Sequence, residues 1–250
     1  MDYVNYNEKI INDWADEGWI WSIPVTPEIC EQARRGDWGI RLTPLKTVPK
    51  DWFPPLKGKK LLGLAAGGGQ QMPILVLVGA DCTVLDFSLK QIEAERLIAK
   101  RENYKINIIQ GDMTKRLPFD DATFDIIVHP VSNVYAEDVN HIWRECFRVL
   151  KSGGILLSGL DNGIDYLFDN YDEPLTITNK LPFNPLKNPE QMAKLQEDDA
   201  IQFSHTFEEQ IGGQLKAGFV MTGAYEDYHP RDAVAARGIP TYWATKAVKP

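Results

Sequence analysis

The sequence predicts one α/β domain built on a doubly wound, mostly parallel sheet of seven strands. Short apolar runs alternate with helical patterns from about residue 59 to residue 160, as expected for parallel strands joined by helices. A bare glycine turn, Gly67 to Gly69, directly follows the first apolar run. The 250 residues, 44% hydrophobic and 25% charged, suffice for one large core. We expect this domain at residues 56–250, after an N-terminal cap at 1–55 and with a lid inserted at 161–200.

The first half of the domain predicts three strands and two helices. Pro73 is acceptable in the first turn of the first helix, and Gly79 lies near its end. Ser88, followed by Gln91 three residues later, has the spacing of a capping box at the start of the second helix. The expected strands are 59–65, 82–88 and 106–112, and the expected helices are 70–80 and 88–103.

The second half begins with a strand at 124–130 and a strongly amphipathic helix. The helix has one apolar stripe with the spacing i, i+3, i+4, i+7, i+8 and i+11: Val139, Ile142, Trp143, Cys146, Phe147 and Leu150. Residues 151–154, Lys-Ser-Gly-Gly, should end it before a fifth strand at 155–160. Thr206 and Glu209 form a second capping-box pattern, for a helix at 207–219. Two final strands are expected at 220–228 and 241–248.

Both ends of the sheet region have additional segments. The cap contains five of the seven tryptophans, Trp14, Trp19, Trp21, Trp38 and Trp52. We expect these mainly to form the cap's own core, with an aromatic wall around a bound acceptor as the alternative. The proline- and asparagine-rich lid is long for a connection in a compact domain, which is typical of a functional loop. Both segments are predicted to close over the site.

Composition excludes several classes of partner. The net charge is −8 and no basic block occurs, which argues against nucleic acid binding. The longest apolar run, 73–80, is too short to cross a bilayer, and no signal-peptide pattern is present. Cys30, Cys82 and Cys146 are odd in number and widely spaced, so neither a disulfide framework nor a metal site is expected. The cytoplasm is the predicted location, and the oligomeric state is left open.

The glycine turn has three interpretations. A phosphate-binding loop requires a lysine, and none occurs between residues 61 and 89. A dinucleotide fingerprint needs a third glycine, where this chain has Met72. A tight turn without a ligand is the third. Asp86 ends the second strand, 19 residues after Gly67 (86 − 67), where a carboxylate can accept both ribose hydroxyls of a nucleoside. This position suits either nucleoside cofactor.

Four segments in this order make the interpretation specific: residues 61–71, 84–88, 110–133 and 145–159. Together they resemble a class I S-adenosylmethionine-dependent methyltransferase of the methyltransferase type 11 domain group, with its Rossmann-like sheet. Two positions depart from the family's first motif, since Gly63 replaces an acidic residue and Ala65 replaces a glycine. The missing carboxylate usually lies near the amino group of the cofactor's methionine part.

The resemblance implies S-adenosylmethionine as the cofactor. A cofactor without phosphates needs close approach of the backbone and a protein carboxylate that binds its ribose, but no lysine. By resemblance, Asp112 accepts from the adenine amino group beside the Met113 backbone. The implied cofactor-binding residues are Ala65, Ala66, Gly67, Gly69, Gln70, Asp86, Phe87, Ser88, Gly111, Asp112, Met113, His129 and Val131.

The end of the fourth strand is the expected meeting point of cofactor and acceptor. His129 is the candidate general base there. Trp14, Trp19, Ser132, Asn133 and Tyr135 are the candidate acceptor-binding residues, and no metal is expected. The sequence therefore predicts methyl transfer from S-adenosylmethionine to a small molecule. A nicotinamide-dependent oxidoreductase and a non-catalytic S-adenosylmethionine-binding module are the alternatives.

Overall fold

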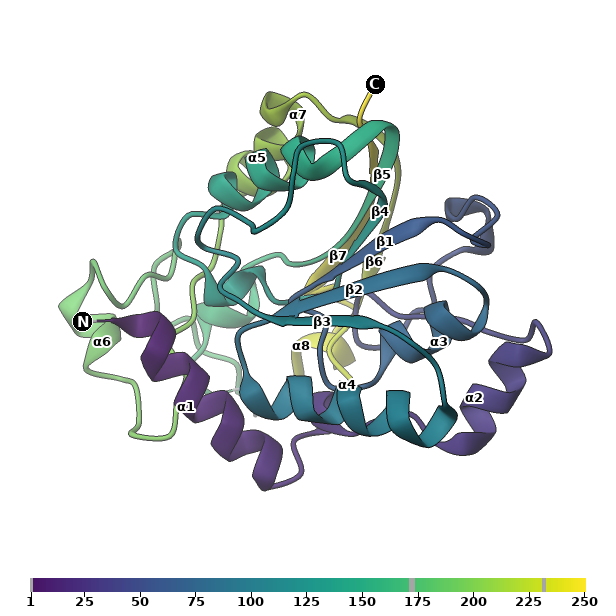
Figure 1. Cartoon of the computed structure of the whole chain (residues 1–250). Helices are drawn as coiled ribbons and strands as arrows, with labels where there is room; N and C mark the ends of the chain where they lie inside the picture. The colour runs from purple at the N-terminus through teal and green to yellow at the C-terminus, as the bar shows by residue number, and fades with distance from the viewer. Residues whose placement is uncertain (1, 171–173, 231–232) are drawn as a thin grey trace.

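The computed structural model describes residues 2–170, 174–230 and 233–250 and confirms the predicted fold class. Its sheet has seven strands in the order β3-β2-β1-β4-β5-β7-β6. Only β7 runs against its neighbours, pairing antiparallel with both β5 and β6. Helices cover both faces of the sheet (Figure 1). The strands are β1 (Lys60–Leu64), β2 (Asp81–Asp86), β3 (Asn107–Gln110), β4 (Phe124–His129), β5 (Leu150–Asp161), β6 (Val220–Asp227) and β7 (Tyr242–Val248).

The helices of the sheet region lie where the apolar periodicity placed them. They are α3 (Gln71–Leu77), α4 (Leu89–Glu102), α5 (Val139–Val149) and α7 (Gly213–Ala217), the last preceded by a π-helical turn, Glu208–Gly212. The α5 stripe is buried against the sheet, apart from the half-buried Phe147. Neighbouring residues of β1 serve opposite faces, because Leu61 joins the core under α3 and Leu62 joins the core under α5.

Two local expectations meet a different or only partial outcome, and a third is confirmed. Residues 151–154 lie inside β5, since the strand begins at Leu150, directly after α5. The Ser88 hydroxyl caps α4 by accepting from the Gln91 N–H, but the Gln91 amide points to the Trp21 carbonyl instead of returning. Thr206 and Glu209 form the complete reciprocal box.

The N-terminal segment contains α1 (Tyr3–Asp16), α2 (Pro27–Arg34) and two short 3₁₀ turns, Ile20–Ser22 and Lys50–Trp52. Its tryptophans do not form one core, which corrects the expectation. Trp14 packs on Trp19, Trp38 packs on Phe53, and Trp52 packs on Tyr225 of the sheet. Ile40, Leu42, Val48 and Trp52 belong to the same buried cluster as β1 and α3. The segment from about residue 38 onward is therefore part of the domain core.

The cap and the 161–200 segment contact each other beside the sheet. The Asn7 side chain donates to the carbonyl of Ile201, one residue past that segment, at 2.8 Å and accepts from the Ile201 N–H at 2.7 Å. The Trp14 indole donates to the Asp198 carbonyl at 3.0 Å. Helices α1 and α6 (Pro189–Met192) accordingly lie near each other in Figure 1. Residues 171–173 of the expected lid lie outside the described residues.

Candidate active site

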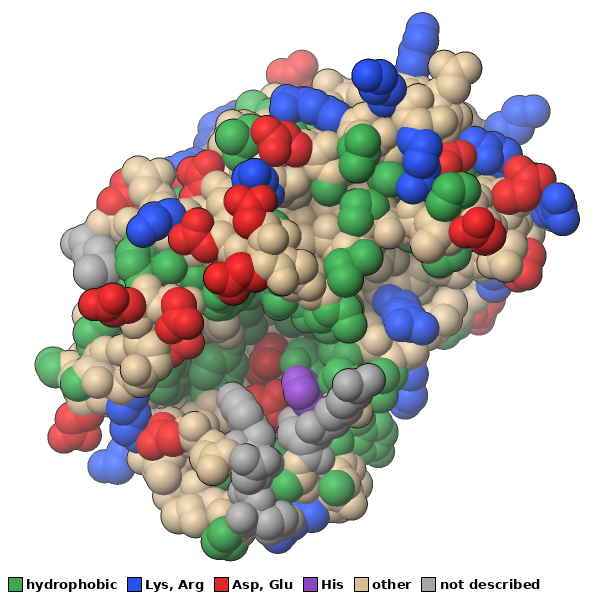
Figure 2. All heavy atoms as spheres, turned by 90° about the horizontal axis from the view of Figure 1, so that it is seen from below, with side chains coloured by type: hydrophobic (Ala, Val, Ile, Leu, Met, Phe, Trp, Pro, Cys, Tyr) green, Lys and Arg blue, Asp and Glu red, His purple; other side chains and the backbone are tan. Residues whose placement is uncertain are grey.

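A cavity of about 220 Å³ opens at the carboxyl ends of β1, β2, β4 and β5. Ligands of doubly wound sheets bind at this edge. Eleven of the residues expected to bind cofactor or acceptor line it: Trp19, Ala65, Ala66, Gly67, Gln70, Asp86, Phe87, Met113, Val131, Ser132 and Tyr135. Gly111 and Asp112 line a smaller adjoining cavity that shares Phe87 and Met113. On the face seen in Figure 2, hydrophobic side chains border a hollow that has acidic side chains inside.

The glycine turn is held by two buried carboxyl groups, one on each side. The Gly67 N–H donates to Asp86 Oδ2 at 3.0 Å, and the Gly69 N–H donates to Glu95 Oε1 at 2.8 Å. Gly68 and Gly69 have φ angles of +88° and +67°, which favour glycine. Burial raises the pKa of Glu95 to about 8. The Gly69 N–H opposes this rise, and nearby Asp86 adds to it. Glu95 was not foreseen, because nothing local marks a helix carboxyl as a partner of this turn.

Bare backbone in this turn serves protein packing as much as ligand approach. A Cβ atom on Gly67 would lie 2.7 Å from Gln91 Cβ and 2.9 Å from an oxygen of Asp86. One on Gly68 would lie 2.9 Å from the Trp21 carbonyl oxygen. A side chain on Gly67 would therefore meet α4 and the end of β2, which already fill that space.

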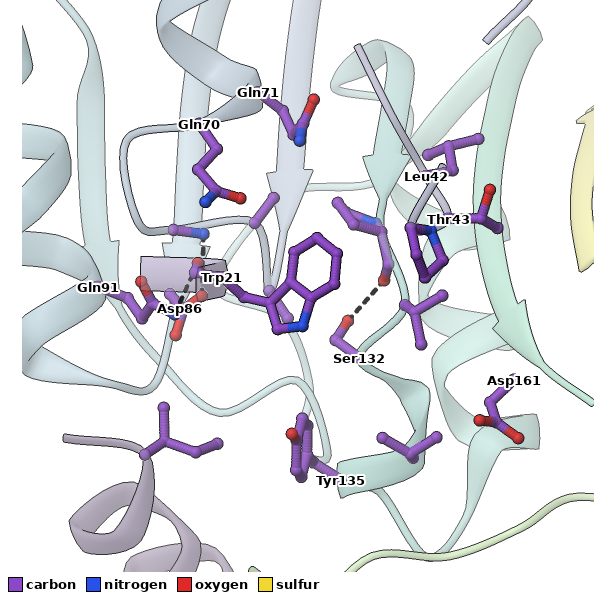
Figure 3. A pocket seen from close by; sticks show the side chains of 18 of the residues that line it. Trp21, Leu42, Thr43, Gln70, Gln71, Asp86, Gln91, Ser132, Tyr135 and Asp161 are labelled. Carbon is purple, nitrogen blue, oxygen red and sulfur yellow. Dashed lines mark hydrogen bonds between the residues drawn. The ribbon is translucent and has the colours of Figure 1, made fainter. Parts of the chain in front are cut away.

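The N-terminal segment lies directly on the glycine turn. The Val25 N–H donates to the Gly69 carbonyl at 2.9 Å. The Gln70 side-chain amide donates to the carbonyls of Ile20 and Ile23, both at 2.9 Å. These bonds position the 3₁₀ turn that carries Trp21, whose indole extends into the cavity with Asp86 on one side and Ser132 on the other (Figure 3).

Asp86 is the buried acid at the end of β2 and lines the cavity. Its Oδ2 accepts from the Gly67 N–H and its Oδ1 accepts from the Ser88 N–H, each at 3.0 Å. Burial raises the pKa of Asp86 to about 6, and the N–H groups of Ser88, Gly67 and Phe87 oppose that rise. In the adjoining cavity, Asp112 Oδ1 accepts from the Thr114 N–H at 2.7 Å. The two acids border adjacent parts of one groove, at the ends of β2 and β3.

The departure at Gly63 has a packing explanation. A Cβ atom there would lie 2.5 Å from Met72 Sδ and 2.9 Å from Met72 Cγ. Met72 is fully buried, so its side chain occupies the space that an acidic side chain at position 63 would need. Ala65, the second departure, has a φ of +47°, in the region that favours glycine, so this chain keeps the turn's backbone shape with an alanine.

Five expected site residues line neither of these two cavities. Gly69 and Ser88 are turned into the contacts with α4 and the cap, where the Ser88 hydroxyl lies 2.7 Å from Asn12 Oδ1. Trp14 packs on Trp19 behind the wall. Asn133 is fully buried and donates to Gln210 Oε1 at 2.5 Å. These four support the site's walls.

His129, the fifth, is poorly placed for the expected role of general base. It is fully buried, its Nδ1 lies 2.9 Å from the Leu64 carbonyl, and Trp143 packs edge-on at 6.1 Å. Burial lowers the pKa of His129 to about 4, although the bond to Leu64 acts in the opposite direction. The ring is therefore neutral, with Nδ1–H donating to Leu64, and it links β4 to β1 below the cavity.

The structure also brings residues to the cavity that the sequence analysis missed. Asp161 ends β5 and lies across the cavity from Asp86 (Figure 3). The same strand-end argument that selected Asp86 applies to Asp161 and could have found it. The remaining ones come mostly from long segments with no local signal: Ile11, Trp21, Arg41, Leu42, Thr43, Pro44, Gln71, Gln91, Pro130, Val134, Tyr166, Gln202 and Tyr242.

Comparison with known proteins agrees with this fold. A family model described as a methyltransferase domain matches residues 62–158. The chain is 44% identical to an uncharacterized methyltransferase, YbaJ, of Bacillus subtilis, over 252 aligned residues and 98% of each chain. An S-adenosylmethionine-dependent methyltransferase from Mesorhizobium loti matches with a TM-score of 0.62 and 20% identity, over 80% of this chain and 94% of that one.

A third relative is the geranyl diphosphate C-methyltransferase from Streptomyces coelicolor, solved with S-adenosyl-L-homocysteine. It matches with a TM-score of 0.55 and 14% identity, over 78% of this chain and 73% of that chain. The fold and the site at its carboxyl edge thus define a class I methyltransferase. The chain belongs to the S-adenosylmethionine-dependent methyltransferase family, and S-adenosylmethionine is its cofactor.

The described residues contain neither a candidate membrane span nor a candidate metal site. No helix among them combines the length and the apolarity needed to cross a bilayer. Within 2–170, 174–230 and 233–250, no three His, Cys, Asp or Glu side chains are grouped so that they could bind a metal ion.

Proposed function

We propose that this enzyme transfers the methyl group of S-adenosylmethionine to a small molecule that enters the cavity between Asp86 and Asp161. The observation that carries the proposal is the coupling of Asp86 to the glycine turn at the cavity wall. A carboxylate fixed in this way, at the end of β2, matches the position from which a nucleoside ribose is bound.

The residues present fit this cofactor. Asp86 would accept from the ribose hydroxyls, Asp112 would accept from the adenine amino group, and the backbone of Ala65 to Gly67 would border the methionine part. Arg41 is the one Lys or Arg among the described lining residues, which suits a cofactor without phosphates. When bound, the cofactor supplies a methyl group on a sulfonium that leaves readily. The chain's own task is therefore to bind, to orient the acceptor in line and to exclude water.

The alternatives have less support. A dinucleotide needs a glycine where α3 packs closely on β1, and the fully buried Met72 lies there. The missing acid at position 63 suggested a binder without catalysis. The contact with Met72 supplies a packing reason for Gly63, so the departure alone does not argue against catalysis.

Enclosure supports a small acceptor. Trp19 and Trp21 of the cap, Tyr166 of the 161–200 segment and Tyr242 of β7 all line the cavity. A site enclosed by segments from three parts of the chain suits a small molecule better than a polymer. The exclusion of nucleic acid, the cytoplasmic location and the division into cap and lid stay predictions.

Label transfer tests the proposal. The full chain is incubated with S-adenosylmethionine labelled on its methyl group and a bacterial extract, which is then separated into small molecules, RNA and protein. We expect the label in the small-molecule fraction, with its formation reduced at least about tenfold by Asp86→Ala. Label in RNA or protein would contradict the proposed acceptor class.

A further inference from the structure

Resting on the proposed function, we propose that Asp161 is the acceptor-binding base, and that the acceptor carries a protic heteroatom, an N–H or O–H group. The sheet order places Asp161 two strands away from the glycine turn, because β4 separates β1 from β5. Asp86 and Asp161 therefore define the two halves of one cavity, with Trp21 and Ser132 between them (Figure 3).

The backbone holds the two acids differently: Asp86 is held through both oxygens, each keeping a second lone pair for a ribose hydroxyl, whereas Asp161 is held through one. Both oxygens of Asp86 accept from backbone N–H groups. Asp161 Oδ1 accepts from the Gly163 N–H at 2.7 Å, and no hydrogen bond joins its Oδ2 to a described residue. Asp161 is 6% exposed and lines the cavity, so this exposure is toward the acceptor half.

Apart from Asp86, which the proposed function assigns to the ribose, no other described residue of the cavity wall offers comparable proton-accepting chemistry. Asp86 and Asp161 are the two carboxyls among the described lining residues, and no histidine is part of that lining. His129 is buried below the cavity, and His205, also buried, has Nε2 3.1 Å from the Asn133 carbonyl. Burial, with Asp165 nearby, raises the pKa of Asp161 to about 8, which suits a group that takes up a proton near neutral pH.

The surroundings of Asp161 favour a largely apolar acceptor with one polar group. Leu42, Pro44 and Val134 provide apolar wall, and the Tyr166 hydroxyl donates to Gln202 Oε1 at 2.7 Å. The acceptor's heteroatom lone pair forms the new bond to the methyl carbon. The sulfur–methyl bond breaks with its electron pair kept by sulfur, and the heteroatom's proton passes to the carboxylate of Asp161. The products are a thioether, a methylated acceptor and a protonated Asp161, so atoms and charge are conserved.

The test uses four probes that share one skeleton: 2-phenylethylamine, 2-phenylethanol, the methyl ether of 2-phenylethanol, and phenylacetate. Their affinities for the full chain saturated with S-adenosylhomocysteine are measured by calorimetry or ligand-observed NMR. We expect the amine or the alcohol to bind at least about tenfold more tightly than the ether and phenylacetate. Preference for the amine assigns a nitrogen acceptor, and preference for the alcohol assigns an oxygen acceptor.

Asp161→Asn keeps an oxygen for the Gly163 N–H and should remove the preference while leaving the S-adenosylhomocysteine affinity within about twofold. Asp81→Asn, at the exposed opposite end of β2, is the matched control and should keep the preference. Equal binding of all four probes, tighter binding of phenylacetate, no binding of any probe, or a preference that survives in Asp161→Asn would overturn the inference. Failure of S-adenosylhomocysteine and S-adenosylmethionine to bind would instead overturn the proposed function.

Discussion

Gly63→Ala tests whether packing, and not loss of cofactor binding, explains the missing acid of the first motif. The new methyl group would lie 2.5, 2.9 and 3.0 Å from Sδ, Cγ and Cε of Met72, where ordinary contacts are 3.4–4 Å. Met72, a residue of α3, is fully buried and must move by up to about 1 Å. Such overpacking costs about 1–3 kcal/mol. Replacing a strand glycine offsets roughly 0.5–1 kcal/mol of this.

The expected result is a net loss of about 0.5–2 kcal/mol in unfolding free energy. For a domain of this size, that lowers Tm by roughly 1–8 °C, at about 2–4 °C per kcal/mol. The change in Tm is measured by thermal unfolding monitored by circular dichroism. Gly212→Ala is the control, because its added methyl would lie at an ordinary 3.5 Å from Glu208 Cγ, and it should leave Tm unchanged or raise it.

The pair Gly63 and Met72 should also be coupled. Met72→Ala alone should cost about 2–5 kcal/mol, because it leaves a cavity in the core. In the double variant, the methyl on residue 63 occupies part of that cavity, so the total loss should fall short of the sum by roughly 0.5–3 kcal/mol. Losses that add within about 0.5 kcal/mol would refute the packing explanation.

Three further predictions concern the cofactor half. Asp86→Ala should weaken S-adenosylmethionine binding by about 1.5–3 kcal/mol, or roughly 12- to 150-fold, by calorimetry; unchanged affinity in a folded variant would remove the ribose assignment. Because burial raises the pKa of Asp86 to about 6 and the ionised form accepts the hydroxyls, affinity should be constant above about pH 7 and fall by roughly tenfold per pH unit below pH 6. The Asp86→Ala variant should lose this pH dependence. Gly67→Val should lower Tm and cofactor affinity together, because its Cβ meets Gln91 at 2.7 Å; lost affinity with an unchanged Tm would instead show that a side chain at position 67 meets only the ligand.

The sheet was predictable because its information is local. Each parallel strand is a short apolar run, and α5 has a stripe that repeats along one face, so element type follows from a few consecutive residues. Asp86 could be placed for the same reason, since a residue at a strand's end lies at the ligand edge whatever the remaining chain does.

The cap contacts and the surroundings of the site could not be predicted, because they depend on residues that lie far apart in the sequence. Nothing near Asn7 indicates that it pairs with Ile201, 194 residues later, or that Trp52 joins the sheet core. The need for glycine at 67 and 68 was clear, but its cause required knowing that α4 and Trp21 pack there. His129 was taken for a base because strand ends were assumed to point into the site, whereas its ring turns back to Leu64.

The most direct measurement is calorimetric titration of the full chain with S-adenosylmethionine, S-adenosylhomocysteine and NAD, repeated with Asp86→Ala. We expect both sulfur cofactors to bind at one site per chain, NAD not to bind measurably, and the substitution to weaken both sulfur cofactors by a similar factor. Binding of NAD without binding of either sulfur cofactor, or affinity for S-adenosylmethionine that is unaffected by Asp86→Ala in a folded protein, would contradict the placement of the cofactor on the glycine turn and Asp86.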